Sequence, residues 1–375
     1  MTIEARWVSS LDELRALGPR YDEMVLASGD GGVFYQREWL ERVWPYYEAT
    51  VGGTLAFLIV LAGGEPVALA PLVIRAQGWT HARQRTLAFI GGTWDELDNW
   101  MPGLMFASSD PREQADTTAV LADAIARRGW DLLELRLMRP SPSLDALRTH
   151  LPGLLISTDR LQTPRARVDG GLARYWASRS KRLTRILDRG RTRAAADGVS
   201  LRHEVTPDVP LAHRDEIETL HLARQDRLRT TGRMRSSPFE HPQARRVFWS
   251  LVDWASGRGQ LRTHWLRIGE RTAAYVIALH HAGTTFTYFN AIDPAAERYH
   301  PGSLILAELI EREVRDYGAS VIDLMAGANL TKTLLATEAV TLSNLSLVNP
   351  DRPAARAKDA WIRLARRLAL SARGR

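Results

Sequence analysis

Residues 284–327 read TTFTYFNAIDPAAERYHPGSLILAELIEREVRDYGASVIDLMAG and contain a strand, a turn, a helix and a second strand in succession. The segment 284–292 is rich in Thr, Phe and Tyr, which favour strands, and it ends at an Asp-Pro pair. The pattern predicts an apolar helix over 302–316 and a buried strand over 320–325. This alternation of strands and helices predicts an α/β (α+β) fold.

The start of that helix is a candidate phosphate site. Pro301 and Ser303 are residue types that open helices, and Gly302 between them lets a ligand approach the backbone closely. A helix N-terminus offers free N–H groups and a positive dipole end, which suit a pyrophosphate. Arg298 and His300 in the preceding loop are candidate phosphate ligands. The alternative interpretation is an ordinary helix start with solvated loop residues.

The chain contains an internal repeat. Residues 55–75 and 261–281 both read as β-hairpins around a turn that contains Gly-Glu. Later in each half, 129–135 and 318–324 both consist of a glycine, four residues, an acidic residue and a leucine. Two coincidences in the same order predict a duplicated α/β unit.

Each half is therefore predicted to be a mixed, mostly antiparallel sheet flanked by helices. With 375 residues the chain has room for about two domains. We assign 1–160 to an N-terminal unit, 161–350 to a C-terminal unit with the candidate ligand site, and 351–375 to a tail helix. The Pro- and Ser-containing stretch 141–153 is predicted to link the units, and the last strand is expected near 341–348.

Composition excludes several classes of protein. The chain is 45% hydrophobic and 25% charged, as in ordinary folded proteins, and it has no cysteine. Disulfides, thiolate catalysis and Cys-ligated metals are thereby excluded. The longest apolar runs are shorter than the ~18–20 residues that span a bilayer, and the first residues lack a signal-peptide pattern. These features predict a cytoplasmic protein.

The basic residues are concentrated in two segments. The net charge is +7, but seven basic residues and one acidic residue fall within 179–193. We predict a helix there, in which Lys181, Arg182 and Arg185 belong to a basic wall facing phosphates. The alternative is a solvated connecting helix.

The second basic segment, 351–375, has eight basic and two acidic residues. Projected as a helix, it places Trp, Leu and Ala on one side and five arginines on the other. Such a helix suits an anionic membrane surface, which adds the option of peripheral attachment to the inner face of the cytoplasmic membrane. The alternative is a terminal helix docked on the body. Nucleic acid is not an expected partner, since no known binding motif accompanies the charge.

Several segments together resemble the CelD-type acetyltransferase group, a Fem-related branch of the GNAT superfamily. The resemblance covers about 30–345 and is carried, in order, by Phe34–Trp44, Leu87–Asp98, Ser178–Arg193, Leu220-His221 with Arg224, Asp293-Pro294, Pro301-Gly302, Asp323 and Gly327. It implies two tandem GNAT-like units with an acyl-CoA site in the second, and no metal. The family often has a Tyr-Lys pair after the last glycine. Here the tyrosine is missing, and Lys332 is the one retained candidate for cofactor binding.

The resemblance implies direct attack of an amine on a thioester, which needs a base and a proton donor for the thiolate. His221 matches a family position and titrates in the right range for a base. Asp293 is a second candidate for the base, and Tyr288 is a candidate thiolate donor, with Asn290 on the same face for substrate binding. Each of these residues also has a purely structural interpretation: a core histidine, a turn aspartate, a packed tyrosine.

An acidic cluster in the first unit contains Asp95, Glu96 and Asp98. Asp95 and Asp98 are candidate ligands for a cationic amine, and a plain surface loop is the alternative. His280 and His281 face opposite sides of a strand, which argues against a two-His metal site. His264 and Asp323 are expected to be structural.

These features predict an acyl-CoA-dependent N-acyltransferase. Within the resembling group, the basic amphipathic tail favours a membrane-borne amine such as a sphingoid long-chain base. The alternatives are an acetyltransferase acting on an envelope sugar, a Fem-like transferase that uses aminoacyl-tRNA, and a non-catalytic scaffold with a GNAT shell.

Overall fold

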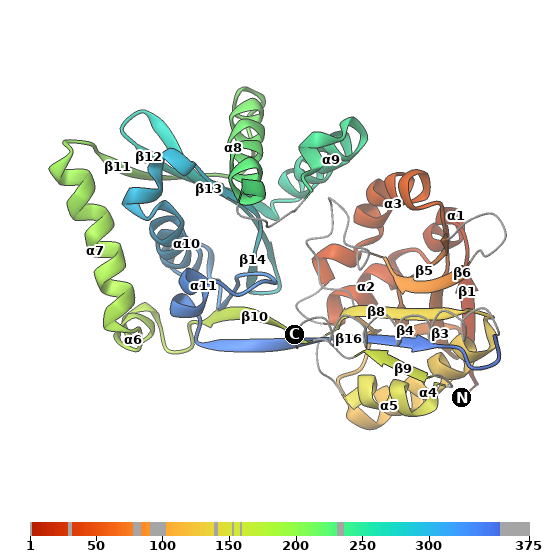
Figure 1. Ribbon diagram of the computed structural model, residues 1–375. Coiled ribbons are helices and arrows are strands. Elements are labelled where there is room, and N and C mark those ends of the chain that lie inside the picture. Colours follow the sequence, from red (N-terminus) through yellow and green to blue (C-terminus); the bar gives the residue numbers. More distant parts are fainter. Residues whose placement is uncertain are drawn as a thin grey trace, which may run out of the picture. The chain divides into compact units, whose positions relative to one another are not determined.

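The computed structural model describes residues 2–28, 32–77, 84–90, 103–138, 142–151, 154–157, 160–230 and 236–352 (Figure 1). The chain divides into two compact units. Unit 1 consists of 1–93, 101–161 and 341–375, and unit 2 of 94–100 and 162–340. The predicted mixed α/β class with two units of similar architecture is confirmed.

Unit 1 begins with a strand and three helices and continues as a series of strands interrupted by two helices. Its elements are β1 (Ile3–Val8), α1 (Leu11–Arg15), α2 (Pro19–Ala27), η1 (Gly32–Tyr35), α3 (Arg37–Val51), β2 (Gly53–Leu55), β3 (Phe57–Ala62), β4 (Glu65–Ala70), β5 (Leu72–Gln77), β6 (Gln84–Phe89), β7 (Met105–Phe106), α4 (Pro111–Arg127), β8 (Leu132–Met138), α5 (Pro142–His150) and β9 (Leu154–Ser157).

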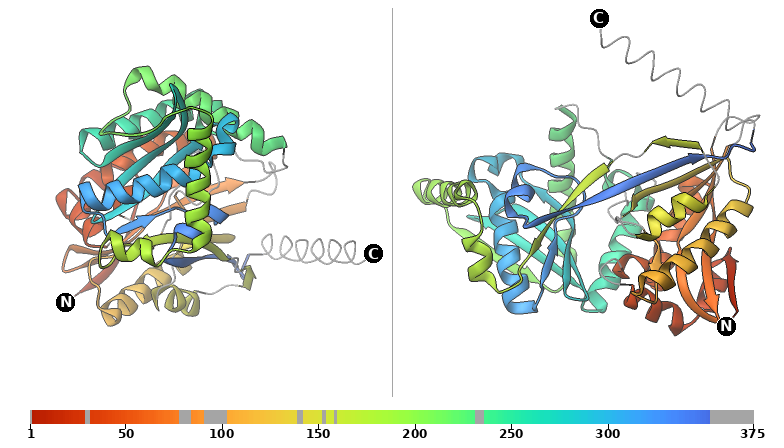
Figure 2. Two further views of the ribbon diagram at one scale, coloured as in Figure 1. Left: turned by 90° about the vertical axis from the view of Figure 1, so that its left-hand side faces the viewer. Right: turned by 90° about the horizontal axis from the view of Figure 1, so that it is seen from below.

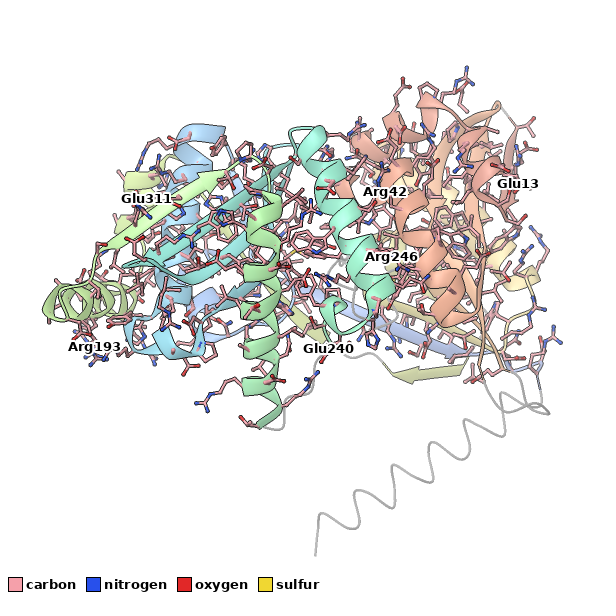
Figure 3. The ribbon with its side chains drawn as sticks, turned by 90° about the horizontal axis from the view of Figure 1, so that it is seen from above. Glu13, Arg42, Arg193, Glu240, Arg246 and Glu311 are labelled. Carbon is pink, nitrogen blue, oxygen red and sulfur yellow. The ribbon has the colours of Figure 1, made fainter. Side chains whose placement is uncertain are left out.

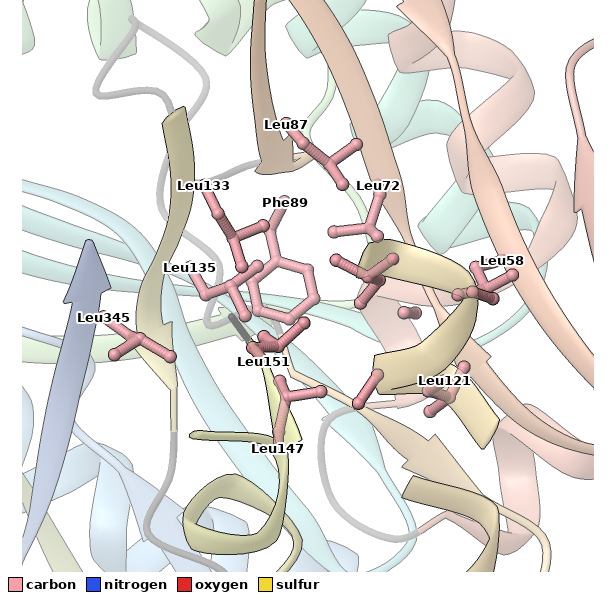
Figure 4. Close-up of a cluster of buried hydrophobic side chains, with 14 of the residues drawn as sticks. Leu58, Leu72, Leu87, Phe89, Leu121, Leu133, Leu135, Leu147, Leu151 and Leu345 are labelled. Atoms are coloured by element: carbon pink, nitrogen blue, oxygen red, sulfur yellow. The ribbon is translucent and has the colours of Figure 1, made fainter. Parts of the chain in front are cut away.

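The core of unit 1 lies between its strands and helices α4 and α5 (Figure 4). Leu72, Leu87 and Leu133 from neighbouring strands meet Leu121 of α4 and Leu147 of α5, all with 1% exposure or less. Residues 142–150, which we expected to be part of a linker, are thus a helix. The apolar residues of that stretch recur at helical spacing, and their burial outweighs its Pro and Ser content.

Unit 2 begins with two helices and continues in the order strand, two helices, three strands, helix and strand. Its elements are α6 (Leu172–Ala177), α7 (Lys181–Ala196), β11 (Leu201–Thr206), α8 (Leu211–Thr230), η2 (Pro238–Glu240), α9 (Pro242–Gly257), β12 (Leu261–Ile268), β13 (Arg271–His281), β14 (Thr284–Ile292), η3 (Pro294–Tyr299), α10 (Pro301–Tyr317), β15 (Val321–Asp323) and α11 (Leu330–Leu335).

The sheet of unit 2 has the order β11-β12-β13-β14-β15-β10, where β10 is Arg160–Arg167. Every neighbouring pair is antiparallel except β14 and β15, which are parallel and joined by α10. Helix α10 packs on one face of the sheet and is itself covered by α7, whose Leu183 and Leu187 enter the same core cluster (Figure 2). On the opposite side, α8 and α9 pack against β14 and β12.

The two units share details that agree with the predicted duplication of one unit. In both hairpins the second strand carries a bulge at the same place. In β3–β4, Val60 pairs with Ala68 and Leu61 with Pro66, so one residue of β4 is skipped. In β12–β13, Leu266 pairs with Ala274 and Arg267 with Thr272, so one residue of β13 is skipped. In both units one parallel ladder of three residue pairs joins the strands on either side of the long helix, β6–β8 and β14–β15. Shared bulges and shared ladders support a duplicated unit.

Two strands carry the chain from one unit to the other. Strand β10 leaves unit 1 and pairs with β15 in unit 2, and β16 (Glu338–Val348) leaves unit 2 and pairs with β8 and β9 in unit 1. We had assigned 341–350 to the C-terminal unit. The structure places them in unit 1, because Leu345 and Leu347 are buried in its core.

Two expectations concern residues outside those that the structure describes. Asp95 and Asp98, the candidate amine ligands, lie in the range 91–102, and the predicted tail helix lies almost entirely in 353–375. Both stay predictions. Among the described helices, none is long and apolar enough to cross a membrane.

Candidate functional site

The candidate site begins where β14 and β15 separate. Their parallel ladder ends at the pair Phe286–Asp323, although β14 continues to Ile292. The pairing of β14 with β13 is also irregular at this point, because the register shifts between the pairs Leu279–Phe286 and Ile277–Phe289. Beyond it, in the described part of the sheet, β14 has a ladder partner on its β13 side alone. The free edge leaves backbone N–H and C=O groups that can pair with an extended ligand.

The N-terminus of α10 lies at the end of this free edge. A Cβ atom added to Gly302 would meet Ile292 Cγ2 at 3.4 Å, so the first turn of the helix touches the last residue of β14. His300 precedes the helix in a left-handed conformation (φ 54°) and makes no side-chain cap. The helix therefore presents its positive dipole end without a carboxylate or hydroxyl already bound to it, which favours an anion.

The corresponding helix of unit 1 is built differently at the same point. Asp110 caps α4 and accepts a hydrogen bond from the Arg112 N–H at 2.9 Å, and Glu113 lies in the first turn. These carboxylates already satisfy the dipole and would repel a phosphate. Of the two duplicated units, unit 2 alone thus has its long helix open to an anion.

Ser303 and Lys332 connect α10 to the short helix α11. The Ser303 hydroxyl is 2.9 Å from the Thr331 hydroxyl, and Ser303 is 5% exposed, so its side chain is a structural link between the two helices. Lys332 Nζ donates to the Met325 carbonyl at 3.4 Å. Met325 has a positive φ of 61°, an uncommon conformation for a non-glycine residue, directly after β15.

Loop residues predicted to bind phosphate or to act as the base are already engaged with the protein. Arg298 forms an ion pair with Asp197 at 3.0 Å and lies over the Tyr299 ring. Asp293 caps η3 by accepting from Ala295 N–H at 2.9 Å, and its second oxygen accepts from Arg271 at 2.8 Å. These contacts fix the loop between β14 and α10.

Helix α7 carries the predicted basic segment. Ser180 caps it, and Lys181, Arg182 and Arg185 are exposed. The helix lies very close to the loop before α10, since a Cβ atom added to Gly190 would be 2.4 Å from the Tyr299 carbonyl oxygen. Glycine is therefore required at this position in the helix, although it lowers helix propensity.

His221 is in an aromatic cluster beneath the free half of β14. Its ring stacks on Phe289 with centroids 4.3 Å apart, and its Nε2 is 2.9 Å from Gln225 Nε2. Burial, followed by the nearby charge of Arg224, lowers the pKa of His221 to about 3. The imidazole is thus held neutral and is a weak proton acceptor.

Tyr288 and Asn290 occupy the free half of β14 itself. Tyr288 is 4% exposed and stacks at 6.3 Å on Phe248 of α9. The Asn290 carbonyl accepts a hydrogen bond from Arg224 Nη1 at 3.1 Å, which fixes this part of the strand to α8. The structure thus brings Tyr288, Asn290 and His221 together around one strand segment.

A buried ionic network holds α10 on the sheet, and no motif in the sequence indicated it. Glu313 of α10 is fully buried and accepts two hydrogen bonds of 2.7 Å from Arg262, one of 3.0 Å from His264 Nε2 and one of 2.6 Å from the Thr285 hydroxyl. Burial alone would raise the pKa of Glu313, but the hydrogen bonds from His264 and Arg262 outweigh it and lower the pKa to about 2. A charged glutamate thus connects α10 to β12 and β14.

Comparisons with known proteins agree with this fold. Residues 179–332 match the family described as an acetyltransferase (GNAT) domain. The match runs from the start of α7 into α11 and includes the free edge of β14 and the start of α10. This part of unit 2 is therefore similar to GNAT acetyltransferase domains. No curated protein sequence matches the chain.

Solved structures extend the similarity to both units. The crystal structure of FemX has a TM-score of 0.59 at 10% identity, with 92% of this chain and 98% of that chain covered. A conserved protein of unknown function from Bacteroides thetaiotaomicron has a TM-score of 0.52 at 11% identity, covering 92% and 100%. A tandem GNAT protein from the clavulanic acid biosynthesis pathway has a TM-score of 0.49 at 12% identity, covering 93% and 99%. The first two similarities show a common fold over nearly the whole chain.

Among the described residues, no group of three or more His, Asp or Glu is arranged to hold a metal ion.

Proposed function

We propose that unit 2 is an N-acyltransferase that takes its acyl group from acyl-CoA. The observation that carries this proposal is the uncapped N-terminus of α10 next to the free edge of β14. A pyrophosphate at the helix N-terminus lets the amides of a pantetheine chain pair with the strand edge. The GNAT match over 179–332 supports the same donor.

The proposed reaction is a direct transfer. The amine nitrogen of the acceptor forms a bond to the thioester carbonyl carbon, and the carbon–sulfur bond breaks. The sulfur leaves with the bonding electron pair, and one proton passes from the nitrogen to the thiolate, so the products are an amide and free CoA. The free N–H groups of β14 are placed to hold the developing oxyanion.

The side chains around β14 have separate proposed roles. Tyr288, on the free half of the strand, relays this proton: its hydroxyl protonates the departing thiolate and takes up the proton that the nitrogen loses. His221 acts as a positioning residue, because a pKa of about 3 makes it a poor base for an amine. Asp293 holds the loop through its bond to Arg271, and Asn290 remains a candidate for substrate binding.

The acceptor is an amine. A membrane-borne amphiphile such as a sphingoid long-chain base is the proposal that follows from the basic tail, and peripheral attachment to an anionic membrane accompanies it. Tail deletion should then reduce activity on a vesicle-borne amine and leave activity on a soluble amine unchanged. Equal activities of full-length and tail-deleted protein on the vesicle-borne amine would exclude the membrane role.

Donor binding can be tested by calorimetry with acetyl-, octanoyl- and palmitoyl-CoA and with free CoA. Affinity that rises with chain length indicates a buried acyl chain, since each buried CH₂ contributes about 0.8 kcal/mol. Equal binding of acetyl-CoA and CoA indicates a short-chain donor. No binding of any of the four would refute the proposal.

A matched pair of substitutions tests the helix N-terminus. Gly302→Asp introduces a carboxylate into the first turn of α10, as Glu113 does in the first turn of α4, and should lower CoA affinity more than about tenfold by repelling the pyrophosphate. Gly302→Ala adds the same Cβ atom, at van der Waals distance from Ile292, without the charge. Equal affinities of the two variants would show that the pyrophosphate binds elsewhere.

A further inference from the structure

Three arginines of α7 form a row along one side of the helix. Arg182, Arg185 and Arg189 are spaced three and four residues apart, so they share one side of the helix. All three are exposed, and within the described ranges no ion pair joins any of them to a carboxylate. Such a row of guanidinium groups is suited to an anionic ligand.

The close packing of α7 brings this row to the start of α10. Gly190 follows Arg189 directly, and a Cβ atom there would be 2.4 Å from the Tyr299 carbonyl oxygen and 3.2 Å from Leu304 Cδ1. One turn further on, Arg193 Nη1 donates to the Arg298 carbonyl at 3.1 Å (Arg193 is labelled in Figure 3). The backbone of α7 at Arg189 therefore lies beside the loop and first turn where the proposed pyrophosphate binds.

The other side of α7 is neutralised. Arg191 lies two residues from Arg189, which turns its side chain to the far side of the helix. There it contacts Glu308 of α10 at 3.4 Å. The helix thus separates Arg191, which is paired with α10, from a row of arginines that form no ion pair with the described residues.

We propose that Arg189, assisted by Arg185 one turn before it, binds the 3′-phosphate of the CoA nucleotide. This inference rests on the proposed function, because it assumes a CoA-type donor. The α10 N-terminus then takes the pyrophosphate, and the guanidinium groups take the third, separate phosphate through charge-assisted hydrogen bonds. The site would therefore distinguish CoA from its 3′-dephospho form.

The experiment measures the Kd of free CoA and of 3′-dephospho-CoA by calorimetry for three full-length proteins. The wild type should bind CoA about tenfold more tightly, the effect of one charge-assisted contact at an exposed site. Arg189→Gln should bind both ligands with the weaker affinity, so that the ratio approaches one. The matched control Arg191→Gln, with the same charge change on the same helix, should keep the wild-type ratio.

The outcomes separate this inference from the function on which it rests. Equal binding of the two ligands by the wild type would overturn the inference and leave the acyl-CoA donor intact. A preference for CoA that persists in Arg189→Gln would also overturn it. Binding of neither ligand would overturn the proposed function and the inference together.

Discussion

Glu313 shows how one buried charge can determine the position of a helix. Its two oxygens accept hydrogen bonds from Arg262, His264 and Thr285, so every partner of the carboxylate is a group on the sheet. Removing the charge leaves Arg262 buried and unpaired. Glu313 thus holds α10 on the sheet, and the N-terminus of the same helix forms the proposed phosphate site.

We expect Glu313→Gln to lower the free energy of unfolding by about 3–5 kcal/mol, the cost of breaking a buried ion pair on one side. The control Glu311→Gln removes an exposed pair with Arg315 on the same helix and should cost less than about 1 kcal/mol. Urea denaturation of the three proteins measures both effects. Similar losses in the two variants would show that the network contributes little.

The buried His221 predicts a pH dependence of stability. Its pKa is lowered from 6.5 to about 3, so below pH 6.5 the unfolded chain binds a proton that the folded chain does not. Stability is therefore fully present above pH 6.5 and falls as the pH decreases toward 3. One such group changes the free energy of unfolding by about 1.4 kcal/mol per pH unit.

Denaturation at pH 7 and pH 5 tests this dependence. The wild type should lose about 2 kcal/mol more between the two values than His221→Gln. His150→Gln, at an exposed position at the end of α5, should behave as the wild type does. An identical loss in the wild type and His221→Gln would contradict the burial of a neutral imidazole.

At the residue scale, the sequence predicted residue types better than their partners. It put Tyr288 and Asn290 on one face of a strand and named His221 as a candidate base on a helix, and it expected His264 and Asp323 to be structural. It missed Glu313, because the role of this residue depends on its contact with Arg262, which is distant in the sequence. It also missed Arg189, because the proposed role of this residue depends on the contact between Gly190 and the loop before α10. Such pairings arise from the packing of elements, which no local pattern encodes.

At the element scale, helix α7 depends on one glycine. We expect Gly190→Ala to destabilise the protein by about 1–3 kcal/mol despite the better helix propensity of alanine, because the new methyl group would overlap the Tyr299 carbonyl. Thr192→Ala, at an exposed position of the same helix, should be neutral or slightly stabilising.

Thermal unfolding measures the stability of the two variants and the wild type. The Kd of CoA measures whether each substitution also affects the proposed phosphate site. Since the overlap moves α7 away from the start of α10, Gly190→Ala should also weaken CoA binding, whereas Thr192→Ala should not. A fully stable Gly190→Ala protein would show that the helix and the loop are not in close contact.

Most elements followed from periodicity and turn residues. The predicted helix 302–316 is α10, Pro301–Tyr317, the predicted hairpin 261–281 is β12 and β13, and the predicted strand 284–292 is β14. The stretch 141–153 was misinterpreted as a linker, since a short helix with Pro and Ser near its start resembles a loop in composition. Its apolar spacing, with Leu147 and Leu151 four residues apart, was the signal that could have identified it.

At the scale of the whole molecule, unit 1 depends on a strand that begins in unit 2. Leu347 of β16 is 3% exposed within the core of unit 1. We expect Leu347→Ala to destabilise unit 1 by about 2–5 kcal/mol and unit 2 far less. The neighbouring substitution Ser346→Ala, which removes no buried apolar group, is the control.

Limited proteolysis during a thermal ramp distinguishes the units, because cleavage sites identify which part opens first. In Leu347→Ala, cuts should appear within 2–161 at a lower temperature than in the control. Simultaneous cleavage in both units would show that they unfold together. The sequence predicted a strand near 341–348 but could not assign its partner, since edge pairing depends on distant strands rather than on local residues.

The crossing of β16 has a consequence for synthesis on the ribosome. Most residues of unit 1 have been synthesised when the ribosome reaches position 161. Its sheet, however, is completed only by the residues from 341 onward. At about 5–20 residues per second, the ~180 intervening residues take on the order of 10–40 s to translate. During that interval β8 presents an unpaired edge, which is a site for aggregation or for protection by a chaperone. The half of the chain that is made first is therefore the half that finishes folding last.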